Sequence, residues 1–161
     1  MLFTPLTTTL TAPLVALAGT VATICVSLQL VMVAADVDND LFDADGSDAA
    51  DGNAVANLTY RITALYSGRD AVLGASAGLK HFGTRRLGRS GLATQPPAGQ
   101  DNIWQVDCSS FFPDNVGGMD IHSAYFGQYG TLPLMRGILR GLDRLVLDAK
   151  GMTKGTVWPP S

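Results

Sequence analysis

The chain has 161 residues, of which 47% are hydrophobic and 16% are charged, and its formal net charge is −3 at pH 7. An average soluble domain carries about 25% charged residues. The low charged fraction of this chain therefore favours burial against lipid or partner subunits. The balance also lacks the strong basic excess of a nucleic-acid-binding domain, and no nucleic-acid partner is expected.

The first 35 residues contain no charged side chain. Residues 14–35 form an apolar run that, as a helix, would be about 33 Å long and would cross a hydrocarbon core of about 30 Å. We therefore expect one N-terminal transmembrane helix and a single-pass membrane protein. Gly19 and Thr23 lie in a strip of small residues that would let another membrane helix approach closely. Gln29 is a polar amide that should find a partner inside the bilayer.

Three other interpretations of this apolar run stay open. A secretory signal peptide would begin with a basic region, but residues 1–13 contain no lysine or arginine. A buried core helix of a soluble protein is the second interpretation, and the stem of a pilin-like filament subunit is the third. Because basic residues are missing near both ends of the run, its orientation in a membrane is undetermined.

Seven aspartates follow the apolar run, within residues 36–51. We expect residues 36–53 to form an acidic linker that ends the membrane span and stays in water. Three of the aspartates alternate as in the opening of a calcium-binding loop, since hard cations prefer closely spaced oxygen ligands. These candidate calcium ligands are Asp36, Asp38 and Asp40. The pattern then departs from a calcium loop, because Leu41 stands in place of the tight-turn glycine.

The middle of the chain, residues 54–130, is predicted to be loop-rich. Residues 54–66 favour a short helix, although part of this stretch also alternates as a strand would. Residues 71–82 predict a second small helix. Residues 101–130 combine aromatic side chains with glycine and proline, which predicts irregular chain that packs on a partner.

A basic cluster lies near the end of the second predicted helix, with Lys80 and His81 at its start. Its arginines are candidate contacts for lipid phosphate or for an acidic partner surface, or else part of an exposed loop. They are Arg85, Arg86 and Arg89.

The C-terminal part, residues 131–161, predicts an amphipathic helix over residues 131–150 and an extended tail. One face carries an apolar stripe of Met135, Ile138, Leu142 and Leu145. Arginines recur every four residues on another face and are further candidate contacts for lipid or a partner subunit. These are Arg136, Arg140 and Arg144.

A catalytic site is the least supported feature of the sequence. Cys108 and His122 could serve as nucleophile and base, with Asp107 or Asp120 to orient the histidine, but the spacing alone does not favour this. His81, Cys108 and His122 likewise lack the paired spacing of a metal site. We therefore assign no catalytic residue, metal or cofactor.

Taken together, the sequence predicts a mainly α-helical fold with much irregular chain, divided into residues 1–35, 36–53, 54–130 and 131–161. The expected function is that of a non-catalytic accessory subunit of a membrane complex, with other subunits and lipid as partners. A respiratory-chain or ATP synthase complex of the mitochondrial inner membrane is favoured. The alternatives are a structural subunit of a filament or viral envelope, and a small membrane-anchored enzyme that uses Cys108 and His122.

Overall fold

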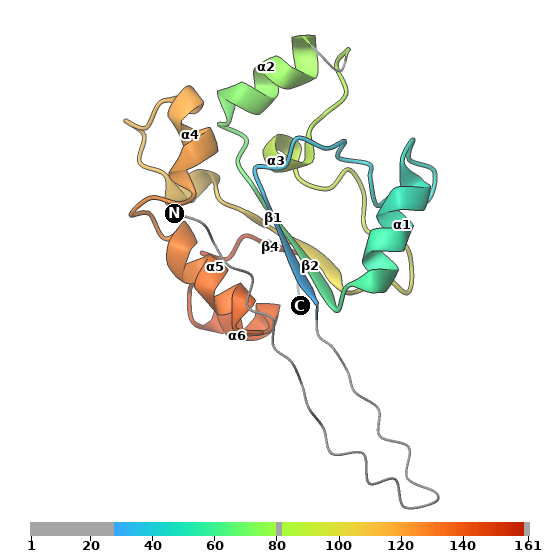
Figure 1. The fold of residues 1–161 in the computed structure, drawn as a ribbon. Coiled ribbons are helices and arrows are strands. Elements are labelled where there is room, and N and C mark those ends of the chain that lie inside the picture. The colour runs from blue at the N-terminus through green and yellow to red at the C-terminus, as the bar shows by residue number, and fades with distance from the viewer. Residues whose placement is uncertain (1–27, 80–81, 160–161) are drawn as a thin grey trace, which may run out of the picture.

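Three apolar stretches of the chain form neighbouring parallel strands in the computed structural model, which describes residues 28–79 and 82–159. The strands are β1 (Gln29–Val33), β2 (Arg61–Tyr66) and β3 (Ile103–Asp107). A short strand, β4 (Val157–Trp158), pairs with β3 in the antiparallel direction. The sheet order is β1-β2-β3-β4 (Figure 1).

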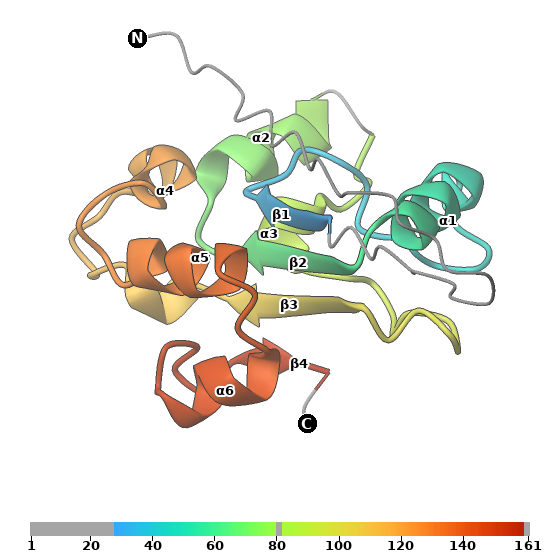
Figure 2. The ribbon, with the colours of Figure 1, turned by 60° about the horizontal axis from the view of Figure 1, so that its bottom comes forward.

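Helices cover both faces of this sheet (Figures 1 and 2). The regular elements besides the strands are α1 (Ala49–Leu58), α2 (Ala71–Leu79), α3 (Leu87–Ser90), the 3₁₀ turn η1 (Ser109–Phe111), α4 (Gly118–Ala124), α5 (Thr131–Leu139) and α6 (Arg144–Ala149). Helices α1 and α3 pack on one face, and α5 and α6 pack on the other. Helices α2 and α4 lie beyond the carboxyl ends of the parallel strands.

The alternation of side chains along the strands divides the core into two clusters. On β2, Ile62 and Ala64 face α1 and α3, whereas Leu65 joins the cluster beneath α5 and α6. The same alternation on β1 sends Val31 to one cluster and Met32 to the other. A parallel sheet covered on both faces needs apolar side chains on both, so its strands read as continuous apolar runs.

The predicted mainly α-helical, membrane-anchored fold is therefore wrong, because the described chain is built on a four-stranded mixed sheet. Residues 14–27 of the predicted transmembrane helix, with Gly19 and Thr23, lie outside the described residues. Gln29, which belongs to the same prediction, is in strand β1. None of the helices in residues 28–79 and 82–159 has the length and apolar character needed to cross a membrane. This finding contradicts the expected single-pass placement in the mitochondrial inner membrane.

The C-terminal amphipathic helix is also corrected, because the structure divides residues 131–150 between α5 and α6. Gly141 adopts a φ of 82°, a left-handed conformation that ends the helical run and that glycine accepts without strain. Met135 and Ile138 are buried as the apolar stripe requires, but Leu145 is exposed. In the middle of the chain, α1 ends at Leu58 and strand β2 follows, so residues 54–66 are part helix and part strand.

The aspartate-rich segment is joined to α3 through a buried arginine. Arg86 is only 3% exposed, and its Nε lies 2.7 Å from Oδ1 of Asp36. Its other nitrogens contact the carboxylate of Asp38 and the backbone carbonyl of Asp36. A buried guanidinium requires such charged partners, because an unpaired buried charge is strongly unfavourable. Part of the aspartate run therefore compensates a positive charge within the fold.

Gly88 allows α3 to touch the end of β1, and its replacement tests this contact. A Cβ atom at position 88 would lie 2.3 Å from the backbone of both Ala34 and Ala35. We expect Gly88→Ala to lower the free energy of unfolding by at least about 2 kcal/mol, because backbone atoms must move. Gly78→Ala is the matched control: its Cβ meets nothing within 4 Å, and the helical site should gain up to about 1 kcal/mol. Urea unfolding followed by circular dichroism measures both, and equal stabilities would contradict the packing described.

Candidate functional site

The loops that follow β2 and β3 meet at the carboxyl edge of the parallel strands. Residues 67–70 leave β2 and lead into α2, whereas residues 108–117 leave β3 and lead into α4. Open α/β sheets bind ligands at this edge, because the loops there can present polar groups above the strands. Asp70 at the end of the first loop meets His122 of α4 at this edge, and the two side chains have the geometry of an acid that orients a base.

Asp70 holds a carboxylate that is shielded completely from solvent. Its Oδ1 accepts a hydrogen bond from the backbone N–H of Leu73 at 3.0 Å, in the first turn of α2. Its Oδ2 lies 2.9 Å from Nδ1 of His122. The backbone carbonyl of Asp70 accepts a hydrogen bond from Nη1 of Arg89. The carboxylate is therefore held on both oxygens, and its backbone is held as well.

His122 approaches Asp70 from α4, and 39% of its side chain is exposed. An ionised carboxylate can only accept hydrogen bonds, so the proton between the two groups belongs to Nδ1. This places the lone pair of the imidazole on Nε2, which makes no hydrogen bond to the described residues. The pair thus has a buried orienting acid and a solvent-accessible base, the arrangement by which Asp and His cooperate in nucleophilic catalysis.

A glycine at the start of α4 permits this approach. A Cβ atom at Gly118 would lie 2.9 Å from the carbonyl oxygen of Arg69 and 3.0 Å from Cβ of Ala71. Residues 118 and 122 are four positions apart and lie on one face of the helix. The close contact at Gly118 therefore brings the same face of α4, with His122, to the chain around Asp70.

Two serines lie at the same edge without contacting His122. Ser109 accepts the backbone N–H of Gly68 at 3.0 Å, and its Oγ lies 3.4 Å from Oγ of Ser67. The backbone N–H of Ser109 in turn donates to Asp107 at 2.8 Å. These bonds tie the loop after β2 to the loop after β3. In the described parts of the chain, no hydroxyl or thiol is hydrogen-bonded to His122.

Cys108 does not have the environment of a nucleophile. It is completely buried, and its Sγ lies 3.7 Å from the carbonyl oxygen of Val106. Burial, reinforced by the nearby negative charge of Asp107, raises the pKa of the Cys108 thiol to about 12. The thiolate is the reactive form of cysteine, so this thiol is inert near neutral pH. The structure therefore does not bring Cys108 and His122 together as nucleophile and base.

The orienting acid suggested by the sequence is also different from the one observed. His122 is paired with Asp70, whereas Asp107 binds the backbone of Ser109 and Asp120 is exposed. The available signal was the position of Asp70, directly between a β-rich stretch and a small helix. It could have been used only if residues 61–66 had first been recognised as a parallel strand.

The arginines predicted to contact lipid or a partner fall into two groups. Arg86 and Arg89 turn inward, the first to two aspartates and the second to the carbonyl of Asp70. The others remain at or near the surface, and their contact with lipid or a partner stays a prediction. They are Arg85, Arg136 and Arg140, which are exposed, and Arg144, which is half-buried.

The three candidate calcium ligands do not converge on one point in the structure. Asp36 and Asp38 contact Arg86, while Oδ1 of Asp40 is buried without a hydrogen-bond partner. Within residues 28–79 and 82–159, no group of three or more His, Cys, Asp or Glu side chains is placed to hold a metal ion. His81, whose spacing to Cys108 and His122 does not favour a metal site, lies outside the described residues.

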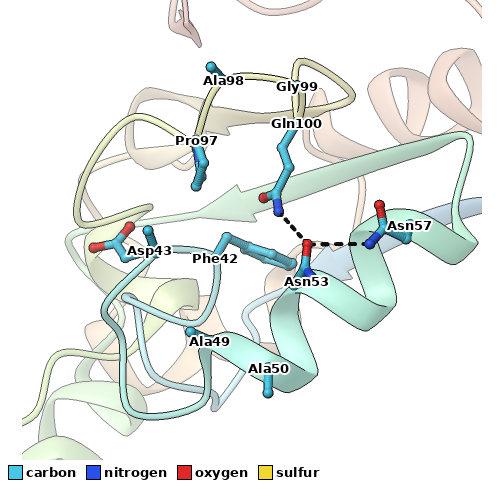
Figure 3. Close-up of a pocket in the computed structure, with 11 residues that line it drawn as sticks. Phe42, Asp43, Ala49, Ala50, Asn53, Asn57, Pro97, Ala98, Gly99 and Gln100 are labelled. Atoms are coloured by element: carbon cyan, nitrogen blue, oxygen red, sulfur yellow. Dashed lines mark hydrogen bonds between the residues drawn. The ribbon is translucent and has the colours of Figure 1, made fainter.

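A cavity of about 510 Å³ lies between α1 and the loop of residues 97–100, away from the Asp70–His122 pair (Figure 3). Asn53 is at its centre, where Oδ1 accepts hydrogen bonds from Asn57 at 3.3 Å and from Gln100 at 3.0 Å. Of the residues that line it, Asp43 alone has an acidic or basic side chain, and its carboxylate accepts a hydrogen bond from the hydroxyl of Thr94. The lining thus offers one carboxylate but no histidine, cysteine, serine or threonine, and the Asp70–His122 pair remains the better candidate for chemistry.

Comparison with protein-family models, with curated proteins and with solved structures finds no match to this chain.

Thiol labelling tests the environment of Cys108. In a Cys25→Ser background, Cys108 is the remaining cysteine. We expect the native protein at pH 8 to react with a chromogenic disulfide at least about 10²-fold more slowly than the unfolded protein, because burial disfavours the thiolate. A Leu139→Cys variant that also carries Cys108→Ala is the exposed control, since Leu139 is 64% exposed. Equal rates for Cys108 and this control would contradict the buried thiol.

Proposed function

We propose that this chain is a hydrolase in which Asp70 orients His122 as the general base for attack on an acyl carbon. The observation that carries the proposal is the 2.9 Å contact between a fully buried carboxylate and Nδ1 of an accessible imidazole. Nε2 of His122 would remove the proton from a hydroxyl or water nucleophile and later donate it to the leaving oxygen. The substrate class is an ester or a related acyl compound.

The order of the two residues along the chain supports the same chemistry. Asp70 follows strand β2, and His122 lies beyond the next parallel strand, β3. In hydrolases that build a nucleophile–acid–histidine triad on a parallel sheet, the acid precedes the histidine and both follow the nucleophile. A nucleophile in this arrangement would precede Asp70, and none of the described hydroxyls before it is bonded to His122. Water, or a hydroxyl that is not hydrogen-bonded to His122 in this structure, would then serve as the nucleophile.

A largely apolar hollow lies along α2, the helix whose first turn binds Asp70, and we infer that it receives an apolar acyl group. The hollow has a volume of about 220 Å³ and lies between the end of β1 and α2, the helix that Asp70 caps. Its lining is mainly aliphatic, with Asp36 and Ser76 at one side. The aliphatic residues are Val72, Ala75 and Leu79.

The non-catalytic accessory role predicted from the sequence has lost its main support. It was derived from a transmembrane helix, and the single-pass placement is wrong. An assembly role, including the filament or envelope alternative, remains an untested prediction. No specific contact in the described residues favours it over the hydrolase.

Ester hydrolysis by the purified chain tests the proposal. We expect turnover of p-nitrophenyl butyrate, and a loss of about 10³-fold in kcat/KM for both Asp70→Asn and His122→Gln, because each removes one member of a cooperating pair. Asp45→Asn and His81→Gln are the matched controls, since Asp45 is exposed and His81 is the other histidine. Circular dichroism confirms folding of each variant. Absence of turnover, or turnover that persists in His122→Gln, would overturn the proposal.

A separate prediction concerns the length of the acyl chain that the apolar hollow accepts. Ala75 is exposed on α2 and lines the hollow, so Ala75→Trp should fill it without disturbing the core. We expect KM for p-nitrophenyl octanoate to rise about tenfold, while kinetics with the acetate ester stay close to wild type, because only the longer chain needs the hollow. Steady-state kinetics with the two esters measure the difference. An unchanged KM for octanoate would remove the hollow from the site.

A further inference from the structure

The guanidinium of Arg69 joins the loop that carries Asp70 to the segment that leads into α4, the helix of His122. Arg69 directly precedes Asp70, and its side chain reaches into the segment between β3 and α4. It donates hydrogen bonds to five backbone carbonyl oxygens of that segment. The acceptors are Ser109 (3.5 Å), Phe112 (2.7 Å), Pro113 (3.1 Å), Asp114 (3.4 Å) and Val116 (3.1 Å).

These carbonyls belong to the stretch that leads directly into α4. Beyond η1 the stretch has no regular secondary structure until α4 begins at Gly118, so its carbonyls have no sheet or helix ladder to bind. The backbone of Arg69 also touches α4, because its carbonyl oxygen approaches Gly118 closely. One residue therefore sets the distance between the loop of Asp70 and the helix of His122.

We propose that Arg69 is a positioning residue that keeps Nδ1 of His122 on the carboxylate of Asp70. The consequence for catalysis rests on the proposed function, whereas the consequence for the imidazole does not. Arginine is suited to this role because its planar fork carries five N–H donors in fixed directions. Lysine has three donors on a flexible stem and can satisfy only part of the carbonyl cluster.

The protonation state of the His122 ring provides a readout that a general loss of stability does not move. The chain has two histidines, so ¹⁵N-histidine labelling with His81→Gln isolates the signals of His122. In the wild-type chain at neutral pH we expect the proton on Nδ1, since Asp70 accepts from it. In Arg69→Met, which keeps an unbranched side chain without donors, we expect a mixture of the two neutral tautomers in a folded protein.

Hydrolysis of p-nitrophenyl butyrate gives the second readout. We expect Arg69→Met to lower kcat by about 10²-fold with little change in KM, since a misplacement of about 1 Å costs this much. Added guanidinium at low millimolar concentration should restore part of the rate. Arg140→Ala is the matched control, because Arg140 is an exposed arginine on the chain after α5. It should leave both readouts unchanged.

The outcomes separate this inference from the proposed function. A folded Arg69→Met protein that keeps the Nδ1–H tautomer and the wild-type kcat overturns the positioning role and leaves the hydrolase proposal standing. A tautomer change in a chain that hydrolyses no ester supports the positioning role and overturns the hydrolase. If Arg69→Met does not fold, Arg69→Lys decides: an intermediate tautomer mixture supports the inference, and a wild-type signature overturns it.

Discussion

The carboxylate of Asp70 is the group on which the arrangement of the carboxyl edge depends. It is fully buried, and burial of a charge is tolerated only where hydrogen bonds replace the lost water. One oxygen receives the N–H of Leu73 and so fixes the start of α2, while the other receives Nδ1–H of His122 and so fixes α4. Two helices that pack at the end of the sheet are thereby joined at one acidic group.

Glycines and arginines around Asp70 hold the carboxyl edge in place. The glycines allow close backbone contacts, and the arginines bind carboxylates and carbonyl oxygens. Gly118 brings α4 to the loop after β2, and Gly74 gives room to the guanidinium of Arg89, whose Cζ would lie 3.1 Å from a Cβ there. Arg89 then holds the backbone of Asp70, and Arg86 neutralises the aspartates after β1. The geometry of the edge is thus produced by close backbone contacts and internal ion pairs, so a histidine that is partly exposed is still held in one orientation.

Sequence patterns revealed some helices but not the sheet that organises them. The charge-free run that ends at Ala35 satisfies the length rule for a membrane helix, yet Gln29–Val33 is a strand whose side chains are needed on both faces. A continuous apolar run shows no periodicity that separates a strand buried on both faces from a helix, so the strand within it could not be recognised. The helix expected within residues 71–82 is present as α2.

His122 is a candidate base in the sequence, but Asp70 is 52 positions away. Only the parallel pairing of β2 and β3 brings the two residues together.

In the proposed hydrolase, Asp70 and His122 act on a substrate as one unit. A double-mutant cycle on ester hydrolysis measures this most directly, with Asp70→Asn, His122→Gln and the combined variant compared at one pH. We expect the combined variant to lose little more activity than His122→Gln alone, because a pair that works as a unit is already disabled by the loss of its base. Losses that multiply in the combined variant would show that the two residues act independently and would contradict a cooperating pair.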